Sequence, residues 1–200
     1  METQGLLVYS YRLKNAIRFA TKTHEVYQKQ KRKGKDVPYI IHPLAVGLIL
    51  ARAGACEDVV IAGILHDTIE DSIAEKKVTR SMLEERFGAT VAALVDDVTE
   101  PDKDMPWAER KRVARESIKT LSRDALLLKS ADLVSNVVEI LDDYALGRDA
   151  IFERFNAPKS DIVAHYASAI RIARERWPES PLAPDLLNLE HLLAPLAAEA

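Results

Sequence analysis

The chain lacks the features that would tie it to a membrane, an oxidising compartment or a polyanion. Cys56 is its only cysteine, so no intrachain disulfide and no thiolate metal cluster can form. No apolar signal segment opens the chain, and no run approaches the roughly 20 apolar residues that a membrane-spanning helix needs. The formal net charge of −3 gives no general attraction to nucleic acid, so an anion site must be local. We therefore expect a cytoplasmic protein without a nucleic-acid or membrane partner.

Glycine is also scarce, with seven residues, while alanine, leucine and long charged side chains dominate, a composition that favours helix over sheet. Apolar residues recur at intervals of three and four, and clean two-residue alternation is missing. No repeat, low-complexity segment or long linker divides the chain. We therefore predict an all-α fold of roughly nine or ten helices, in a single domain formed by residues 1–200.

Local signals predict where these helices begin and end. A first helix contains Leu13 to Tyr27 and is ended by the basic loop around Gly34. Pro43 fits the first turn of a helix that Gly54 closes, and Ser122 fits the N-cap of a long helix that Gly147 ends. Ser81 and Glu84 are spaced as a capping box for a helix that stops at Gly88. Further helices are expected at about 57–71, 91–98, 106–121, 149–155, 158–177 and 184–197.

The most informative stretch is 66–71, His-Asp-Thr-Ile-Glu-Asp, which follows the apolar run 59–65. On a continuous helix, His66, Asp67, Glu70 and Asp71 fall within an arc of roughly 140°. Four ionisable groups would then share one face directly after a buried segment. A solvated helix end is the plain alternative, but burying an imidazole and a carboxylate unpaired costs several kcal/mol, and a divalent cation compensates both.

Two more residues would complete a metal site. His42 follows an apolar segment and precedes Pro43, so it projects from a rigid helix entry, although a core or capping histidine is the alternative. Asp132 lies in the middle of the apolar stretch 126–134, where its alternative role is a salt bridge to Lys129. His42, His66, Asp67 and Asp132 form a mixed nitrogen and oxygen set. That set suits manganese or iron(II), with zinc, cobalt and magnesium as weaker candidates.

The same residues carry a resemblance to a known family. Their order resembles that of the HD-domain phosphohydrolases, and the fuller pattern is similar to the hydrolase domain of the RelA/SpoT family. The matching segments are 32–33, 38–44, 66–71, 87–88, 94–99 and 129–136. The resemblance covers roughly residues 10–175, the expected core of the domain, and implies an HD-domain helical bundle. There is no room in 200 residues for the synthetase domain of the long bifunctional members.

The resemblance implies a small, stand-alone hydrolase that uses Mn²⁺ to cleave the 3′-pyrophosphate from guanosine tetra- and pentaphosphate alarmones. It implies metal ligation by His42, His66, Asp67 and Asp132. Glu70 and Asp71, expected beside the metal, would activate the attacking water. Arg32 and Lys33 match positions that hold the nucleotide, Asn136 matches one that contacts the nucleoside, and Tyr166 resembles a tyrosine that packs against the nucleotide.

Several departures from the family pattern concern the nucleotide side of the site. Leu133 follows Asp132 where a basic residue is usual, Ser135 stands where histidine is common, and the basic loop before His42 is one residue longer. The identity of the base is therefore left open. A second hypothesis is a hydrolase for an adenosine alarmone or for the 2′-phosphate of NADPH. A third is a sensor that only binds alarmone, which the paired acids Glu70 and Asp71 argue against.

The positively charged segments have alternative interpretations. The loop with Lys29, Lys31, Arg32, Lys33 and Lys35 is a phosphate site, a solvated loop or a nucleic-acid patch. A metal site nearby favours a polyphosphate ligand. In the basic segment 109–115, one or two side chains are expected to face the 5′-phosphates and the others solvent. His24, His165 and His191 are expected only to pack or to lie on the surface.

Overall fold

The computed structural model describes residues 9–100 and 104–198, and within these ranges the chain is helical, with one isolated bridge between Lys31 and Pro38 in place of any strand. This confirms the all-α prediction. The elements are α1 (Tyr11–Thr21), the π-helix η1 (Lys22–Tyr27), α2 (Ile41–Arg52), α3 (Glu57–Leu65), α4 (Thr68–Asp71), the 3₁₀ turn η2 (Ala74–Lys76), α5 (Arg80–Phe87), α6 (Ala89–Val98), α7 (Trp107–Ile118), α8 (Arg123–Gly147), the 3₁₀ segment η3 (Arg148–Arg154), α9 (Lys159–Arg176) and α10 (Ala183–Ala198).

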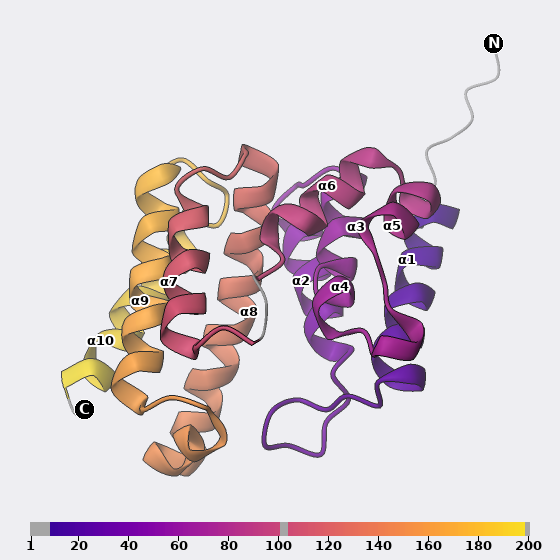
Figure 1. The fold of residues 1–200 in the computed structure, drawn as a ribbon. Coiled ribbons are helices and arrows are strands. Elements are labelled where there is room, and N and C mark those ends of the chain that lie inside the picture. Colours follow the sequence, from indigo (N-terminus) through magenta and orange to yellow (C-terminus); the bar gives the residue numbers. More distant parts are fainter. Residues whose placement is uncertain (1–8, 101–103, 199–200) are drawn as a thin grey trace.

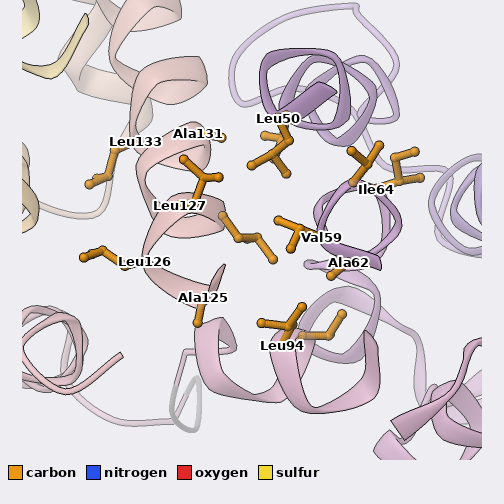
Figure 2. Packing of buried hydrophobic residues seen from close by; sticks show 14 of the residues in the cluster. Leu50, Val59, Ala62, Ile64, Leu94, Ala125, Leu126, Leu127, Ala131 and Leu133 are labelled. Carbon is orange, nitrogen blue, oxygen red and sulfur yellow. The ribbon is translucent and has the colours of Figure 1, made fainter. Parts of the chain in front are cut away.

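Helix α8 lies between two groups of helices. Figure 1 shows α1 to α6 on one side of it and α7, α9 and α10 on the other. Its apolar residues cover more than one face, so that it packs against α2, α3 and α6 as well as α9 and α10. In Figure 2, Leu126 and Leu133 lie on the side of α8 that faces away from Leu50 and Val59. A polar residue on α8 is therefore held in place from two sides.

Close approach of α2 and α3 fixes the first side of this core. All seven residues from Val59 to Leu65 are buried, so α3 is covered on every face. Gly47 and Gly63 make the approach possible. A Cβ atom on Gly47 would lie 2.6 Å from Cγ1 of Ile64, and one on Gly63 would lie 2.4 Å from Cδ1 of Leu50. Ordinary side chains at these two positions would separate the helices.

The expected continuous helix over 57–71 was wrong in one respect. Helix α3 ends at Leu65, and α4 begins at Thr68 after a turn at His66 and Asp67. Side chains compete with the helical hydrogen bonds here, because Nδ1 of His66 donates to the Gly63 carbonyl and Oγ1 of Thr68 donates to the Leu65 carbonyl. The backbone therefore turns at the two residues that carry the predicted metal ligands.

Other predicted ends were confirmed or corrected. Ser122 caps α8, since its Oγ accepts from the backbone N–H of Ala125 at 3.2 Å. The capping box at Ser81 was wrong, because Thr79 is the N-cap of α5 and accepts from the N–H of Met82. The first helix continues to Tyr27, but its last part is the π-helix η1, and the segment from 148 is a 3₁₀ helix. Among the described residues, no helix combines the length and the apolar character needed to cross a bilayer.

Candidate metal centre and adjoining pocket

The four predicted metal ligands come from three separate parts of the chain and lie together. His42 is in the first turn of α2, His66 and Asp67 form the turn after α3, and Asp132 lies in the middle of α8. Nε2 of His66 lies 3.1 Å from Oδ2 of Asp67, and Nε2 of His42 lies 3.3 Å from Oδ1 of Asp132. Cross distances from His42 to Asp67 and from His66 to Asp132 are 3.7 and 3.8 Å. Two imidazole nitrogens and two carboxylate oxygens thus face one small volume.

Both histidines present the nitrogen that a metal ligand requires. Nδ1 of His66 donates to the carbonyl of Gly63 at 2.7 Å, so Nε2 is the nitrogen that offers a lone pair when the imidazole is neutral. That Nε2 is buried and makes no hydrogen bond, although Asp67 is close. Nδ1 of His42 lies 2.9 Å from Oγ of Ser135, a contact that orients its Nε2 toward the same volume. A buried lone pair beside two carboxylates fits a bound cation.

The charges of the site favour a positive group at its centre. Burial opposes protonation of His66, but the nearby charges of Asp67 and Asp132 outweigh it and raise the pKa of His66 to about 9. Burial also opposes ionisation of Asp132, yet Lys129 and the two histidines hold the pKa of that carboxyl well below its ordinary value. Both carboxylates therefore stay ionised at neutral pH. A divalent cation is the group that balances two buried carboxylates while leaving both imidazoles neutral.

Three further side chains hold the carboxylates in place. The hydroxyl of Tyr39 donates to Oδ2 of Asp67 at 2.6 Å. Nζ of Lys129 donates to Oδ2 of Asp132 at 2.8 Å, and Nδ2 of Asn136 donates to Oδ1 of Asp132 at 2.6 Å. The salt bridge considered as an alternative role for Asp132 is thus present, and it coexists with the metal-site geometry. Tyr39 was missed as a site residue, although it lies in the segment 38–44 that carries the family resemblance.

Glu70 and Asp71 lie on α4, and both line a cavity of about 350 Å³ that also includes Asp67. Oδ2 of Asp71 accepts a hydrogen bond of 2.8 Å from Nε2 of Gln30. The other end of this amide, Oε1 of Gln30, lies 2.9 Å from Nδ1 of the fully buried His24. Sequence reasoning gave Gln30 no role. No local pattern points to it, because its partner is 41 residues away.

The same cavity is lined by all four predicted substrate residues, Arg32, Lys33, Asn136 and Tyr166. The end around Lys33 is strongly cationic. Burial lowers the pKa of Lys33, and so do the neighbouring charges of Lys111, Arg110 and Arg154. These residues come from the basic loop, α7 and η3. From α7, the side chains that reach the cavity are therefore those of Arg110 and Lys111, together with the ring of Trp107.

The basic loop is not a row of free positive charges, because several of its side chains pair with acids of α8. Nε of Arg32 donates to Oε2 of Glu139 at 2.7 Å, and Lys35 pairs with both Glu139 and Asp143 of α8. Burial disfavours ionised Glu139, but hydrogen bonds from Arg32 and Lys35 lower its pKa to about 2. Arg32 also lies over the ring of Tyr39, 5.4 Å from its centroid. The loop is thus tied to α8, with Arg32 in a defined orientation.

His165 lines the cavity beside Tyr166, a placement that sequence reasoning did not foresee. Its Nδ1 accepts from Nη1 of Arg115 at 3.1 Å. Burial and the nearby charges of Lys111, Lys129 and Arg115 lower the pKa of His165 to about 3. The imidazole is therefore neutral and adds a polar, uncharged surface to the cationic end. Its position next to Tyr166 in the sequence could have indicated this placement, but only the tyrosine was predicted to contact the nucleotide.

Comparison with known proteins identifies a matching domain family and several similar proteins. The HD domain matches residues 16–142. Guanosine-3′,5′-bis(diphosphate) 3′-pyrophosphohydrolase MESH1 from Danio rerio is 38% identical over 130 residues, which are 64% of this chain and 68% of that protein. The human MESH1 is 37% identical over 130 residues and 69% covered. A guanosine-3′,5′-bis(diphosphate) 3′-pyrophosphohydrolase from Aquifex aeolicus is 39% identical over 127 residues, but only 17% of its length is matched.

Two solved structures share the fold. One is a metazoan ortholog of SpoT that hydrolyzes ppGpp, with a TM-score of 0.70 over 97% of this chain and 98% of that chain, at 24% identity. The other, a protein from Listeria monocytogenes, has a TM-score of 0.69 and 28% identity, and covers 78% of this chain and 99% of that chain. The HD domain match ends at residue 142 and thus contains every predicted metal ligand, whereas Arg154, His165 and Tyr166 lie beyond it.

Proposed function

This chain belongs to the HD domain family, and on that premise we propose that it is a manganese-dependent hydrolase that removes the 3′-pyrophosphate from guanosine tetra- and pentaphosphate alarmones. The relatives from Danio rerio and human bear the name of that activity. The proposal includes one catalytic domain, with its core at residues 10–175, that acts in the cytoplasm.

One observation carries the proposal: each end of the cavity is suited to bind a negatively charged group. Asp67, at one end, groups with the imidazoles of His42 and His66, a set that suits a divalent cation. The other end has the ammonium and guanidinium groups of Lys33, Lys111 and Arg154. A nucleoside with phosphates on both sides of its ribose has two anionic ends, and this cavity offers a positive partner to each of them.

The chemistry at the first end would divide between the cation and the chain. When bound by His42, His66, Asp67 and Asp132, a divalent ion supplies Lewis-acid stabilisation and lowers the pKa of water. Glu70 and Asp71 accept the proton of the water that attacks the first phosphorus of the 3′-pyrophosphate. The bond between that phosphorus and the 3′-oxygen breaks, and the 3′-oxygen takes up a proton, so that inorganic pyrophosphate and a 3′-hydroxyl are released. Gln30 orients Asp71 through the hydrogen bond at 2.8 Å.

Specific contacts hold the nucleotide between the two ends. Arg32, fixed by Glu139, presents its planar guanidinium to a phosphate or to the face of the base. Asn136 contacts the nucleoside, and Tyr166 packs against it. Lys33 and the cations beside it bind the 5′-phosphates as charge-assisted hydrogen-bond donors. The acids Glu70 and Asp71 argue for turnover over sensing, because a pure binding protein has no use for a proton acceptor at that place.

The proposal is tested by comparing substrates. The full-length protein is incubated with Mn²⁺ and, separately, with guanosine tetraphosphate, its adenosine counterpart and NADPH. Released pyrophosphate and phosphate are both quantified. The expected result is pyrophosphate release from the guanosine alarmone with the highest kcat/KM. Preference for the adenosine alarmone would correct the base, phosphate release from NADPH alone would replace the reaction, and tight binding without any release would favour a sensor.

A further inference from the structure

A second pocket, of about 340 Å³, lies away from the cavity described above, between the end of α1 with η1 and the segment formed by η2 and α5. Its lining shares no residue with that cavity. Apolar and aromatic groups of Phe19, Tyr27, Val78 and Met82 form part of it. Its charged residues are Lys22, Lys76, Lys77, Arg86 and a single acid, Glu75.

These cations are arranged around the two rings. Nζ of Lys22 lies 5.3 Å from the centroid of Tyr27, and Nζ of Lys76 lies 5.8 Å from the same centroid. The guanidinium of Arg86 lies 5.5 Å from the centroid of Phe19. The π-helix brings Lys22 and Tyr27 together, because they are five positions apart and the π-helical turn closes at that interval. Both rings thus have cationic groups beside them.

The charges of this pocket are not neutralised by the protein. Within residues 9–100 and 104–198, none of the four cations forms an ion pair with a carboxylate. Most cations that line the catalytic cavity differ in this respect, since Arg32, Arg110, Lys111 and Arg154 pair with acids, although Lys33 does not within the described part of the chain. Four exposed or partly exposed positive charges around one pocket are notable in a chain whose net charge is −3. They favour an anionic ligand.

We propose that this pocket is a second nucleotide site, which binds a nucleoside 5′-diphosphate in addition to any substrate of the catalytic cavity. The rings of Phe19 and Tyr27, with Val78 and Met82, offer a surface for a base. Lys22, Lys76 and Arg86 leave the rings and donate to the phosphate oxygens. The volume suits one small molecule rather than a polymer, which would need an extended positive stripe. This proposal does not depend on the reaction catalysed elsewhere in the chain.

Methionine provides a site-specific reporter, because the chain has only three methionines and Met82 lines this pocket. The full-length protein is labelled with ¹³C at its methionine methyl groups and titrated with GDP in magnesium buffer. The Met82 signal is assigned with the variant Met82→Leu. Met105 is close in sequence to Trp107 of the catalytic cavity and serves as the comparison signal. Inorganic pyrophosphate is titrated in parallel as a probe for phosphate binding alone.

The expected result is a saturable shift of the Met82 signal with GDP. In the double variant Lys22→Gln/Lys76→Gln, the dissociation constant read from Met82 rises at least tenfold, as the loss of charge-assisted hydrogen bonds implies. The matched variant Arg112→Gln/Lys119→Gln removes two charges from α7 and its C-cap and leaves the constant unchanged. Three outcomes overturn the proposal: no Met82 shift at millimolar GDP, equal affinity in the Lys22→Gln/Lys76→Gln variant, or equal affinity for GDP and pyrophosphate. Circular dichroism verifies the fold of each variant.

Discussion

Arg32 in the basic loop donates a 2.7 Å hydrogen bond to Glu139 on α8, although 107 positions separate the two residues. The ion pair is largely buried and it orients the guanidinium over Tyr39. A free arginine on a mobile loop would lose side-chain entropy when it bound a phosphate. Because Glu139 already restricts the Arg32 side chain, less side-chain entropy is lost when a phosphate binds. Glu139 is therefore a positioning residue for Arg32.

Arg32→Ala is expected to weaken substrate binding by about 1.5–3 kcal/mol, the usual range for a hydrogen bond to a charged group. The loss appears in KM if the contact is equally strong in the ground and transition states. Steady-state kinetics on the guanosine alarmone measures it, and metal content is the control, because Arg32 is not a ligand. Glu139→Gln is expected to raise KM by a smaller factor. Parental kinetics at subsaturating substrate in both Arg32→Ala and Lys33→Ala would contradict the role of the loop.

His66→Ala and Asp132→Ala are each expected to lose both the metal and turnover, and a chelator is expected to abolish turnover in the parent. Each replacement removes one of four ligands, and the remaining set cannot balance the site. Metal per chain is measured by mass spectrometry after dialysis. If both variants bound one metal ion per chain, the assignment of His66 and Asp132 as metal ligands would be wrong.

Tyr39→Phe tests whether the Tyr39 hydroxyl helps to hold the predicted metal ligand Asp67 in place. The hydroxyl that donates to Asp67 is removed while the ring is kept, and metal affinity is expected to fall about 10–100-fold, as it does when outer-shell partners of metal ligands are lost. Competition with a fluorescent chelator gives the affinity. Tyr11→Phe is the matched control, because Tyr11 is 73% exposed. Equal affinities in the two variants would mean that the hydrogen bond does not support the metal.

Glu70→Gln and Asp71→Asn separate catalysis from binding. Each keeps the shape of the side chain but removes the proton acceptor, so kcat is expected to fall about a hundredfold or more. Metal content and substrate affinity are expected to stay close to those of the parent. Single-turnover measurements check the rate of the chemical step. Near-normal rates in both variants would leave these acids without the proposed function.

The free energy of unfolding is expected to fall at acidic pH, because the folded protein holds His165 in its neutral form. Its folded pKa of about 3 lies below the value of about 6.5 in an unfolded chain. The unfolded state therefore binds more protons between these values, and the stabilisation that is complete above pH 6.5 is progressively lost as the pH falls toward 3. Between pH 7.5 and 5, the loss is at most about 2 kcal/mol. Urea unfolding of the parent and of His165→Gln at both pH values isolates the contribution of His165 to the free energy of unfolding, since the variant has no imidazole at this position. An equal pH effect in both proteins would contradict the shift.

Most helices and the choice of candidate metal ligands were predictable because they depend on local patterns. Periodicity and caps predicted α6, α8 and α9 to within a few residues, and the ligand types His42, His66, Asp67 and Asp132 follow from charges placed beside apolar runs. The structure brings these four together. Their roles, like those of Glu70, Asp71 and the four substrate residues, stay predictions. So does the single-domain organisation.

The rest of the site depends on contacts that local patterns do not contain. The turn at His66 and Asp67 arises where side chains compete with the helical ladder, and an unbroken helical periodicity hides it. The capping residue of α5 was misassigned because Thr79 and Ser81 are both suitable caps and only packing selects one. Arg32 with Glu139 and Gln30 with Asp71 are pairs separated by 107 and 41 positions, so only the folded chain reveals them.

Helix α8 sets the spacing between the predicted metal site and the cations of the cavity. Asp132, Asn136, Glu139 and Asp143 recur at intervals of four, three and four and share one face of the helix. At about 1.5 Å per residue, Glu139 lies about 10 Å and Asp143 about 16 Å along the axis from the predicted metal ligand Asp132. Because Glu139 holds Arg32 and Asp143 holds Arg154, the rigid rise of α8 sets how far these cations lie from the metal. One residue inserted between Asp132 and Glu139 would rotate Glu139 and Asp143 about the helix axis by about 100° relative to Asp132. The cations that they hold would then no longer lie at the distance that the substrate requires, while the predicted metal site would be kept.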